Sequence, residues 1–252
     1  MNNLMWTLFS NLILAHLLAD FPLQCGRWVA DKRERGCRGD GLYKHVAVVF
    51  IATWLASCSW GFIWWALIIA FVHGIIDYVK ARKTTFGFRA FAIDQFCHVA
   101  VLYVVARYGY DVGNWHQCAA VPVGKELLYP SVVGAYVFCI FSANYWIQEA
   151  LKSCKIQDGL EKGNGDDTNA GSRMSGALIG SLERILILTF MLMGNYEAAG
   201  LTVAAKSILR FKDSEGLRTE YVLVGTLLSF VIAMACAALI LMCVMGIDLV
   251  KR

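Results

Sequence analysis

The sequence has little charge and little proline for its length, and both shortages narrow the class of protein. Asp, Glu, Lys and Arg make up 17% of the 252 residues, whereas soluble domains carry about 25%. Hydrophobic residues make up 58% of the chain and are spread over most of its length. Three prolines leave long helices largely uninterrupted. We therefore predict an all-α fold, a polytopic bundle of transmembrane helices.

Several chemical signatures are also missing. The nine cysteines include no CxxC pair, and their spacing fits neither a zinc ribbon nor a disulfide framework. No GxSxG motif supports covalent serine catalysis. The first apolar run has no basic segment before it and no small-residue cleavage site after it, so we expect it to be retained as a membrane segment. The net charge of +4 is concentrated in a few loops, and we expect no nucleic-acid partner.

Eight apolar segments follow one another along the chain. Several are shorter than the ~20 residues that cross the hydrocarbon of a bilayer. The seventh could be re-entrant or interfacial, which leaves seven or eight spans. We predict a single integral-membrane domain over 1–252, with one half at 1–108 and a C-terminal half at 131–252. The segments are 4–19, 46–60, 62–76, 91–108, 131–150, 176–193, 198–209 and 221–244.

Lysine and arginine are concentrated in alternate loops. The loops after the first, third, fifth and seventh segments are rich in basic residues, whereas 59–61 has none and 109–130 has only Lys125. Basic loops of membrane proteins stay in the cytoplasm. The sequence therefore predicts cytoplasmic basic loops and an external N-terminus. The Gly/Asn/Asp-rich stretch 158–172 is interpreted as a mobile cytoplasmic loop.

Four of the five histidines fall at the cytoplasmic ends of the first four segments. Three of them have an aspartate four residues away, which places both side chains on one face of a helix. The fourth, His45, opens the second segment, and the fifth, His116, falls in an outer loop and is excluded. The pairs are His16 with Asp20, His73 with Asp77, and Asp94 with His98.

Imidazole and carboxylate groups gathered at one depth indicate a metal site, because ionisable residues inside membrane segments are costly and mark function. Zinc fits this ligand set best, with manganese or iron as alternatives. The ligands outnumber what one four-coordinate zinc needs, so either two ions bind or some members orient ligands or act as a general base. A polar network without metal is the alternative. The predicted ligands are His16, Asp20, His45, His73, Asp77, Asp94 and His98, and Asp77 and Asp94 are also the predicted catalytic residues.

The C-terminal half has a second polar group. Glu183 and Arg184 lie inside the sixth segment, Lys206 and Arg210 share one face of the seventh, and Glu220 opens the eighth. We interpret Glu183, Arg184 and Glu220 as members of structural ion pairs. The alternative is an anion site, because arginine binds phosphate through two hydrogen bonds and lysine neutralises it.

Several stretches of the chain resemble a bacterial integral-membrane family, domain of unknown function 3307. They are HLLADFPLQ (16–24), KH (44–45), HGIIDYVKAR (73–82), DQFCH (94–98), GALIGSLER (176–184), AAKSILRF (204–211) and EYVLVGTLLSF (220–230). The resemblance implies a multi-pass protein of the bacterial inner membrane, and the family name implies no activity. A looser similarity to membrane-bound metal-dependent hydrolases suggests hydrolysis.

Three functions are consistent with these features. The first is a metal-dependent hydrolase that acts at the cytoplasmic leaflet on a phosphate-bearing lipid or another anionic substrate. The second is a non-enzymatic sensor, effector or assembly protein with a structural metal, working as a homo-oligomer or with a membrane partner. The third is a metal or proton transporter, which the absence of an internal repeat disfavours. For the hydrolase, the predicted headgroup-binding residues are Lys44, Lys80, Arg82, Lys206 and Arg210.

Overall fold

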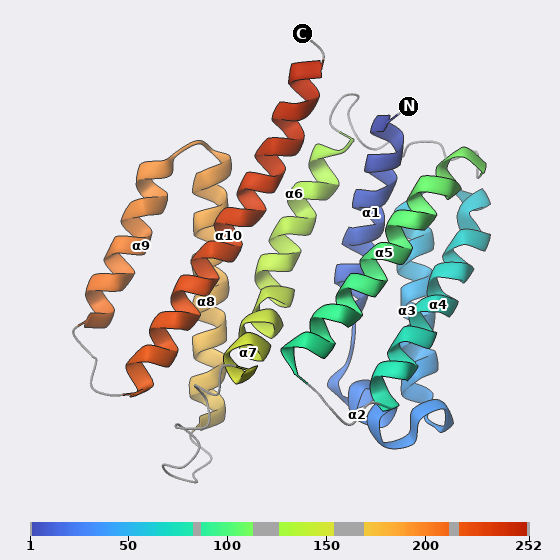
Figure 1. Cartoon of the computed structure of the whole chain (residues 1–252), viewed down its shortest axis with the longest axis horizontal. Helices are drawn as coiled ribbons and strands as arrows, with labels where there is room; N and C mark the ends of the chain where they lie inside the picture. The colour runs from blue at the N-terminus through green and yellow to red at the C-terminus, as the bar shows by residue number, and fades with distance from the viewer. Residues whose placement is uncertain (1, 83–86, 113–125, 154–168, 212–216, 251–252) are drawn as a thin grey trace. The chain divides into compact units, whose positions relative to one another are not determined.

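A computed structural model describes residues 2–82, 87–112, 126–153, 169–211 and 217–250 (Figure 1). All regular structure in these ranges is helical, which confirms the all-α prediction. Seven of the eight apolar segments lie largely on one α-helix each, and the fifth, 131–150, is divided between two α-helices. The helices are α1 (Asn2–Asp20), α2 (Gly26–Arg35), α3 (Asp40–Ser57), α4 (Ile63–Arg82), α5 (Phe88–Val112), α6 (Leu128–Val137), α7 (Ala143–Ser153), α8 (Asn169–Leu192), α9 (Tyr196–Phe211) and α10 (Leu217–Val250).

Four stretches of the described chain are helical, long and apolar enough to cross a membrane: Trp60–Arg82, Phe88–Gly109, Leu128–Ser153 and Leu223–Met242. The segment Leu4–Asp20 is a shorter apolar helix. Large apolar side chains such as Trp64, Phe71 and Phe96 lie on the surface, each about 70% exposed. A soluble surface rarely exposes so many large apolar groups together. The chain is therefore a multi-pass helical protein, and the finer count of seven or eight spans stays a prediction.

The chain divides into two compact units, residues 1–137 and 138–252. The single integral-membrane domain predicted over 1–252, with halves at 1–108 and 131–252, stays a prediction. The boundary between the two units lies inside the apolar segment Leu128–Ser153, where α6 gives way to a π-helical turn at Phe138–Ser142 and then to α7. The loop predicted over 158–172 lies largely outside the described residues, and its last four residues belong to α8.

The first unit is built around α1, which packs against α3, α5 and α6, while α4 packs between α3 and α5. One stripe of α1 faces inward: Leu8, Leu12, Ala15 and Ala19 are all buried. This spacing of three and four residues is that of a helix face. His16 lies on the same stripe and is buried with it. The apolar core thus sets the direction in which the first predicted ligand points.

The structure places a helix in the stretch 25–44, where we predicted a basic loop. There α2 is followed by a 3₁₀ turn at Gly36–Arg38, and α2 packs against α3 and α4. Figure 1 shows α2 at the end of the bundle where α1 ends and α3 begins. Lys32 is the one residue of α2 that is fully buried. The short helix therefore covers the polar end of the bundle.

The second unit pairs α8 with α9 and with α10, and α7 packs against α10. Its apolar core contains Ile187, Phe230 and Ala233. The side chain of Arg184 is also buried here, at 1% exposure.

Candidate metal centre

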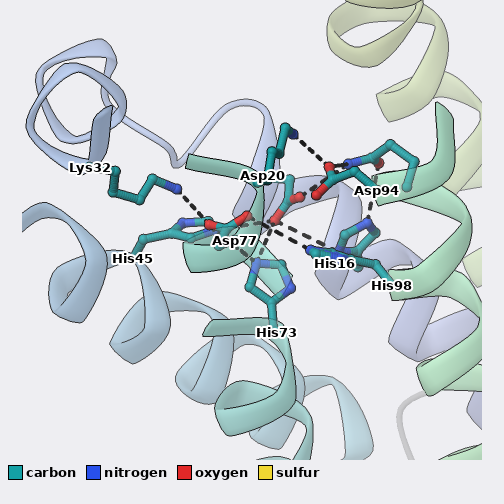
Figure 2. A network of polar contacts seen from close by, with 10 residues as sticks. His16, Asp20, Lys32, His45, His73, Asp77, Asp94 and His98 are labelled. Atoms are coloured by element: carbon teal, nitrogen blue, oxygen red, sulfur yellow. Dashed lines mark hydrogen bonds and ion pairs between the residues drawn. The ribbon is translucent and has the colours of Figure 1, made fainter. Parts of the chain in front are cut away.

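The side chains of all the predicted metal ligands converge (Figure 2), and they come from α1, α3, α4 and α5. The last turn of α1 supplies two of them, α3 supplies one, and α4 and α5 supply two each. Their side chains are between 0% and 9% exposed. The structure thus places together all seven predicted ligands: His16, Asp20, His45, His73, Asp77, Asp94 and His98.

Three of these side chains form a tight triangle of ligand atoms. Asp20 Oδ1 is 3.4 Å from His45 Nε2 and 3.3 Å from His73 Nε2, and the two nitrogens are 3.0 Å apart. Zinc bonds of about 2.0–2.1 Å place tetrahedral ligands about 3.3 Å from one another. Among the described residues, Asp20 Oδ1 is buried without a hydrogen-bond partner. The three atoms therefore surround a point that fits one metal ion.

Asp77 stands beside this triangle and is held by a lysine. Its Oδ2 accepts a hydrogen bond from Lys32 Nζ at 2.6 Å and lies 3.5 Å from His45 Nε2. Its Oδ1 lies 3.9 Å from His98 Nε2. A buried carboxylate needs such a partner, because desolvation of an unpaired charge is expensive. Asp77 is thus neutralised by α2 from one side and faces histidines on the other.

Asp94 is arranged in a similar way on α5. Its Oδ2 accepts hydrogen bonds from Lys80 Nζ at 2.6 Å and from Gln95 Nε2 at 3.3 Å. Its Oδ1 and both ring nitrogens of His98 are buried, and none of them has a hydrogen-bond partner among the described residues. Most buried polar atoms in native proteins are hydrogen-bonded. Five such atoms lie in this cluster, counting Asp20 Oδ1 and His45 Nδ1, and the buried His/Asp groups that carry them could hold a metal ion.

Gln95 connects the two ends of the cluster. Its Oε1 is 3.4 Å from His16 Nε2, and its Nε2 is 3.5 Å from Asp20 Oδ2. His16 Nδ1 is 3.7 Å from Asp20 Oδ1. Such outer contacts fix the tautomer and orientation of metal ligands. Gln95 and His16 are therefore placed to orient the carboxylate of Asp20.

The sequence did not identify Lys32 as part of the site. It lies in a run of basic residues that we assigned to a loop. A helix prediction for this stretch would have pointed to Lys32, because on α2 the partly buried Trp28 and Val29 share a face with it. A lysine on the apolar face of an amphipathic helix is a candidate for a buried ion pair.

A small cavity adjoins the histidines. His16, His73 and His98 line it together with apolar residues of α3, α4 and α5. The cavity has a volume of about 10 Å³, which is about the space that one buried water needs. The cluster therefore has room for a water beside its ligands and little more.

The predicted headgroup-binding residues lie in different places. Lys80 belongs to the cluster and is the most exposed of its charged groups, at 33%. The ammonium of Lys44 lies 3.4 Å from exposed Asp40, and the guanidinium of Arg82 stacks over the ring of Tyr78 at 5.1 Å.

In the second unit, Lys206 forms an ion pair with Glu183. This contact is of the kind that we predicted for Glu183, a structural ion pair. The side chains of Arg210 and Glu220 lie outside the described residues.

Arg184 is bound differently from our expectation of an ion pair. Its guanidinium donates to the Cys139 carbonyl at 2.7 Å, to Asn144 Oδ1 at 2.6 Å, and to the hydroxyls of Ser229 and Ser181 at 2.9 and 3.1 Å. All four acceptors are neutral. The π-helical turn explains why Arg184 binds neutral acceptors. The turn disturbs the regular backbone hydrogen bonds of the helix and leaves carbonyl oxygens that accept hydrogen bonds from side chains.

These features define a class: a multi-pass helical membrane protein with a buried His/Asp/Lys cluster at one end of a four-helix core. Over residues 8–122 the chain matches the model of a family described as "Protein of unknown function (DUF3307)". This range contains every predicted metal ligand, and the resemblance is confirmed there. No curated protein and no solved structure matches the chain. The looser similarity to hydrolases therefore finds no support in these comparisons.

Proposed function

We propose that the chain is a membrane-embedded, metal-dependent hydrolase that acts at the cytoplasmic leaflet on a phosphate-bearing lipid or another anionic substrate. The observation that carries the metal site is the triangle of Asp20 Oδ1, His45 Nε2 and His73 Nε2 at 3.0–3.4 Å. Three protein ligands with a fourth position left for water are typical of catalytic zinc sites.

The roles of the surrounding residues follow from their contacts. Zinc, or manganese or iron in its place, would supply a Lewis acid and an activated water. Asp77 and Asp94 are the groups that could accept a proton or complete the ligand set. Lys80 is partly exposed beside Asp94, and can contact an anionic headgroup from the edge of the site. Arg82, one turn after Tyr78, is exposed on the same helix.

The membrane setting is part of the proposal. The cluster occupies the helix ends next to the basic stretches 25–44 and 80–89, which supports a cytoplasmic site in a bacterial inner membrane. Helices α3, α8 and α9 do not meet the criterion for a span by length and apolar content. We propose that they also enter the membrane, because α3 packs along α4, α8 packs along α10 and α9 packs against α8.

A non-enzymatic protein with a structural metal is the second candidate. The observation that favours it is the enclosure of the cluster, whose side chains are at most 9% exposed apart from Lys80. A closed ligand shell with no access for a substrate would support a sensor or assembly role. The cluster lies at helix ends and not midway along them, which disfavours the third candidate, a transporter of metal ions or protons.

The test uses the full chain purified in detergent and reconstituted in lipid vesicles. Metal content is measured by plasma mass spectrometry, and released inorganic phosphate is measured with vesicles that contain phosphatidic acid or an isoprenoid phosphate. His73→Ala removes one corner of the triangle and should lower zinc affinity by more than about 100-fold, because even outer-shell partners are worth about 10–100-fold. His116→Ala is the matched control and should keep wild-type metal content and activity.

Two results would contradict the proposal, and the second of them separates the two candidates. Wild-type protein that binds none of zinc, manganese and iron would refute the metal site. Protein that binds metal but releases no phosphate from either kind of vesicle would replace the hydrolase by the structural-metal candidate.

A further inference from the structure

Asp77 directs its two carboxylate oxygens toward different histidines. Oδ2 lies 3.5 Å from His45 Nε2 and 4.0 Å from His73 Nε2, whereas Oδ1 lies 3.9 Å from His98 Nε2. A carboxylate between two sets of ligands is the usual bridge in two-metal sites, where the ions are about 3.5–4 Å apart. The rings of His73 and His98 are close enough for such a pair, with centroids 4.0 Å apart.

The far side of this carboxylate has its own ligand atoms. Asp77, Asp94 and His98 each offer an atom within 4.8 Å of the others. None of these three belongs to the triangle of Asp20, His45 and His73. His98 is 3% exposed, and neither of its ring nitrogens has a hydrogen-bond partner among the described residues. Burying an imidazole without hydrogen-bond partners costs free energy, because its hydration is lost, and a bound ligand would offset that cost.

We infer that the cluster binds two divalent cations, one in the triangle and one held by Asp77, Asp94 and His98, with the carboxylate of Asp77 as the bridge. The inference rests on the proposed function, and it assigns Asp77 and Asp94 as ligands in place of a general base. The distance of 3.9 Å between Asp77 Oδ1 and His98 Nε2 exceeds the tetrahedral edge by about half an ångström. Binding of the second ion would therefore draw these side chains closer together.

The charges of the cluster indicate what else a two-metal site needs. Three aspartates stand against two lysines, Lys32 and Lys80, which leaves one net negative charge when the histidines are neutral. Two divalent cations would turn this into three net positive charges in a buried place. Such an excess is costly unless an anion neutralises it. A phosphate ester has the charge and the oxygen atoms for that role, which connects the second ion to the substrate class proposed above.

Manganese is the probe for the test, because two Mn²⁺ ions that share a carboxylate give an exchange-coupled electron paramagnetic resonance spectrum. The full chain in detergent is loaded with Mn²⁺, freed of excess ion and examined for bound manganese and for coupling. We expect two equivalents and a coupled spectrum for wild type. His98→Gln and Asp94→Asn should each retain one equivalent and lose the coupling. Asp40→Asn removes an exposed carboxylate outside the cluster and should behave as wild type.

Each other outcome overturns a stated part. One equivalent in wild type refutes the second ion and leaves the single-metal proposal standing. Two equivalents without coupling refute the Asp77 bridge, and two coupled equivalents in His98→Gln refute the assignment of His98. No bound manganese, zinc or iron refutes the proposed function together with this inference. The wild-type measurements need no variant, so they decide the question even if a substituted protein fails to fold.

Discussion

Lys32 offers the sharpest test of how the cluster is held together. Lys32→Met keeps most of the aliphatic stem and removes the ammonium that donates to Asp77 Oδ2 at 2.6 Å. Both partners are at most 9% exposed, and removing one member of a buried pair costs about 3–5 kcal/mol. For a chain of this size, 1 kcal/mol corresponds to about 2–4 °C in Tm. The metal-free variant should therefore melt about 6–20 °C below wild type.

A divalent cation should reverse this loss. In wild type the ion must share Asp77 with Lys32, whereas in the variant it finds the carboxylate unpaired. If about 3 kcal/mol of the cost of the unpaired charge is relieved on binding, zinc should bind the variant about 100-fold more tightly than wild type. Zinc should also raise the Tm of the variant more than that of wild type.

Melting is followed by tryptophan fluorescence in detergent, with and without a chelator, and zinc affinity is measured by competition with a fluorescent chelator. Lys44→Met is the matched control, because Lys44 pairs with Asp40 on the surface, where the two side chains are 55% and 83% exposed. Exposed pairs contribute about 0–1 kcal/mol. Equal melting of the two metal-free variants would contradict the stabilising role of the Lys32–Asp77 pair. Equal zinc affinity in Lys32→Met and wild type would show that Asp77 lies outside the reach of the ion.

Three further predictions concern the rest of the structure. Arg184→Met should lower the free energy of unfolding by about 3 kcal/mol or more, since it leaves the Cys139 carbonyl and other buried acceptors unpaired, and metal content, a property of the first unit, should not change. Gly41→Ala should destabilise by about 1–3 kcal/mol, because its Cβ would lie 2.7 Å from the carbonyl oxygen of Trp28, whereas Gly26→Ala, with nothing within 4 Å, should not; both are checked by thermal melting. A chelator should lower the Tm of wild type, and zinc at about 100 times its Kd should restore about 2.7 kcal/mol of the free energy of unfolding. Removal of the metal is checked by plasma mass spectrometry. An unchanged Tm in the metal-free protein would contradict coupling between metal binding and folding.

Much of the candidate site could be predicted because its information is local. His73 and Asp77 are four residues apart, and helix geometry alone places them on one face. The distribution of lysine and arginine then placed four histidines at one end of the bundle. Neither step needs knowledge of which helices touch.

The parts that escaped prediction depend on contacts between distant residues. Lys32 reaches Asp77 across 45 positions of the chain, and its basic neighbours gave no reason to distinguish it. Arg184 reaches the Cys139 carbonyl across the same number of positions. Nothing in the local sequence showed that a π-helical turn would leave that oxygen for a side chain to satisfy.

The sequence by itself determined that this is a helical membrane protein with histidine and aspartate at one depth, because hydropathy and helical spacing act over a few residues. Only the tertiary structure decided which atoms meet. It selected Asp20, His45 and His73 as a triangle of metal-binding size and set Asp77 between this triangle and His98. It also brought Lys32 from α2 to neutralise that carboxylate. The physical reason is that distances of 3–4 Å between side chains depend on how helices pack, and packing is a property of the whole bundle.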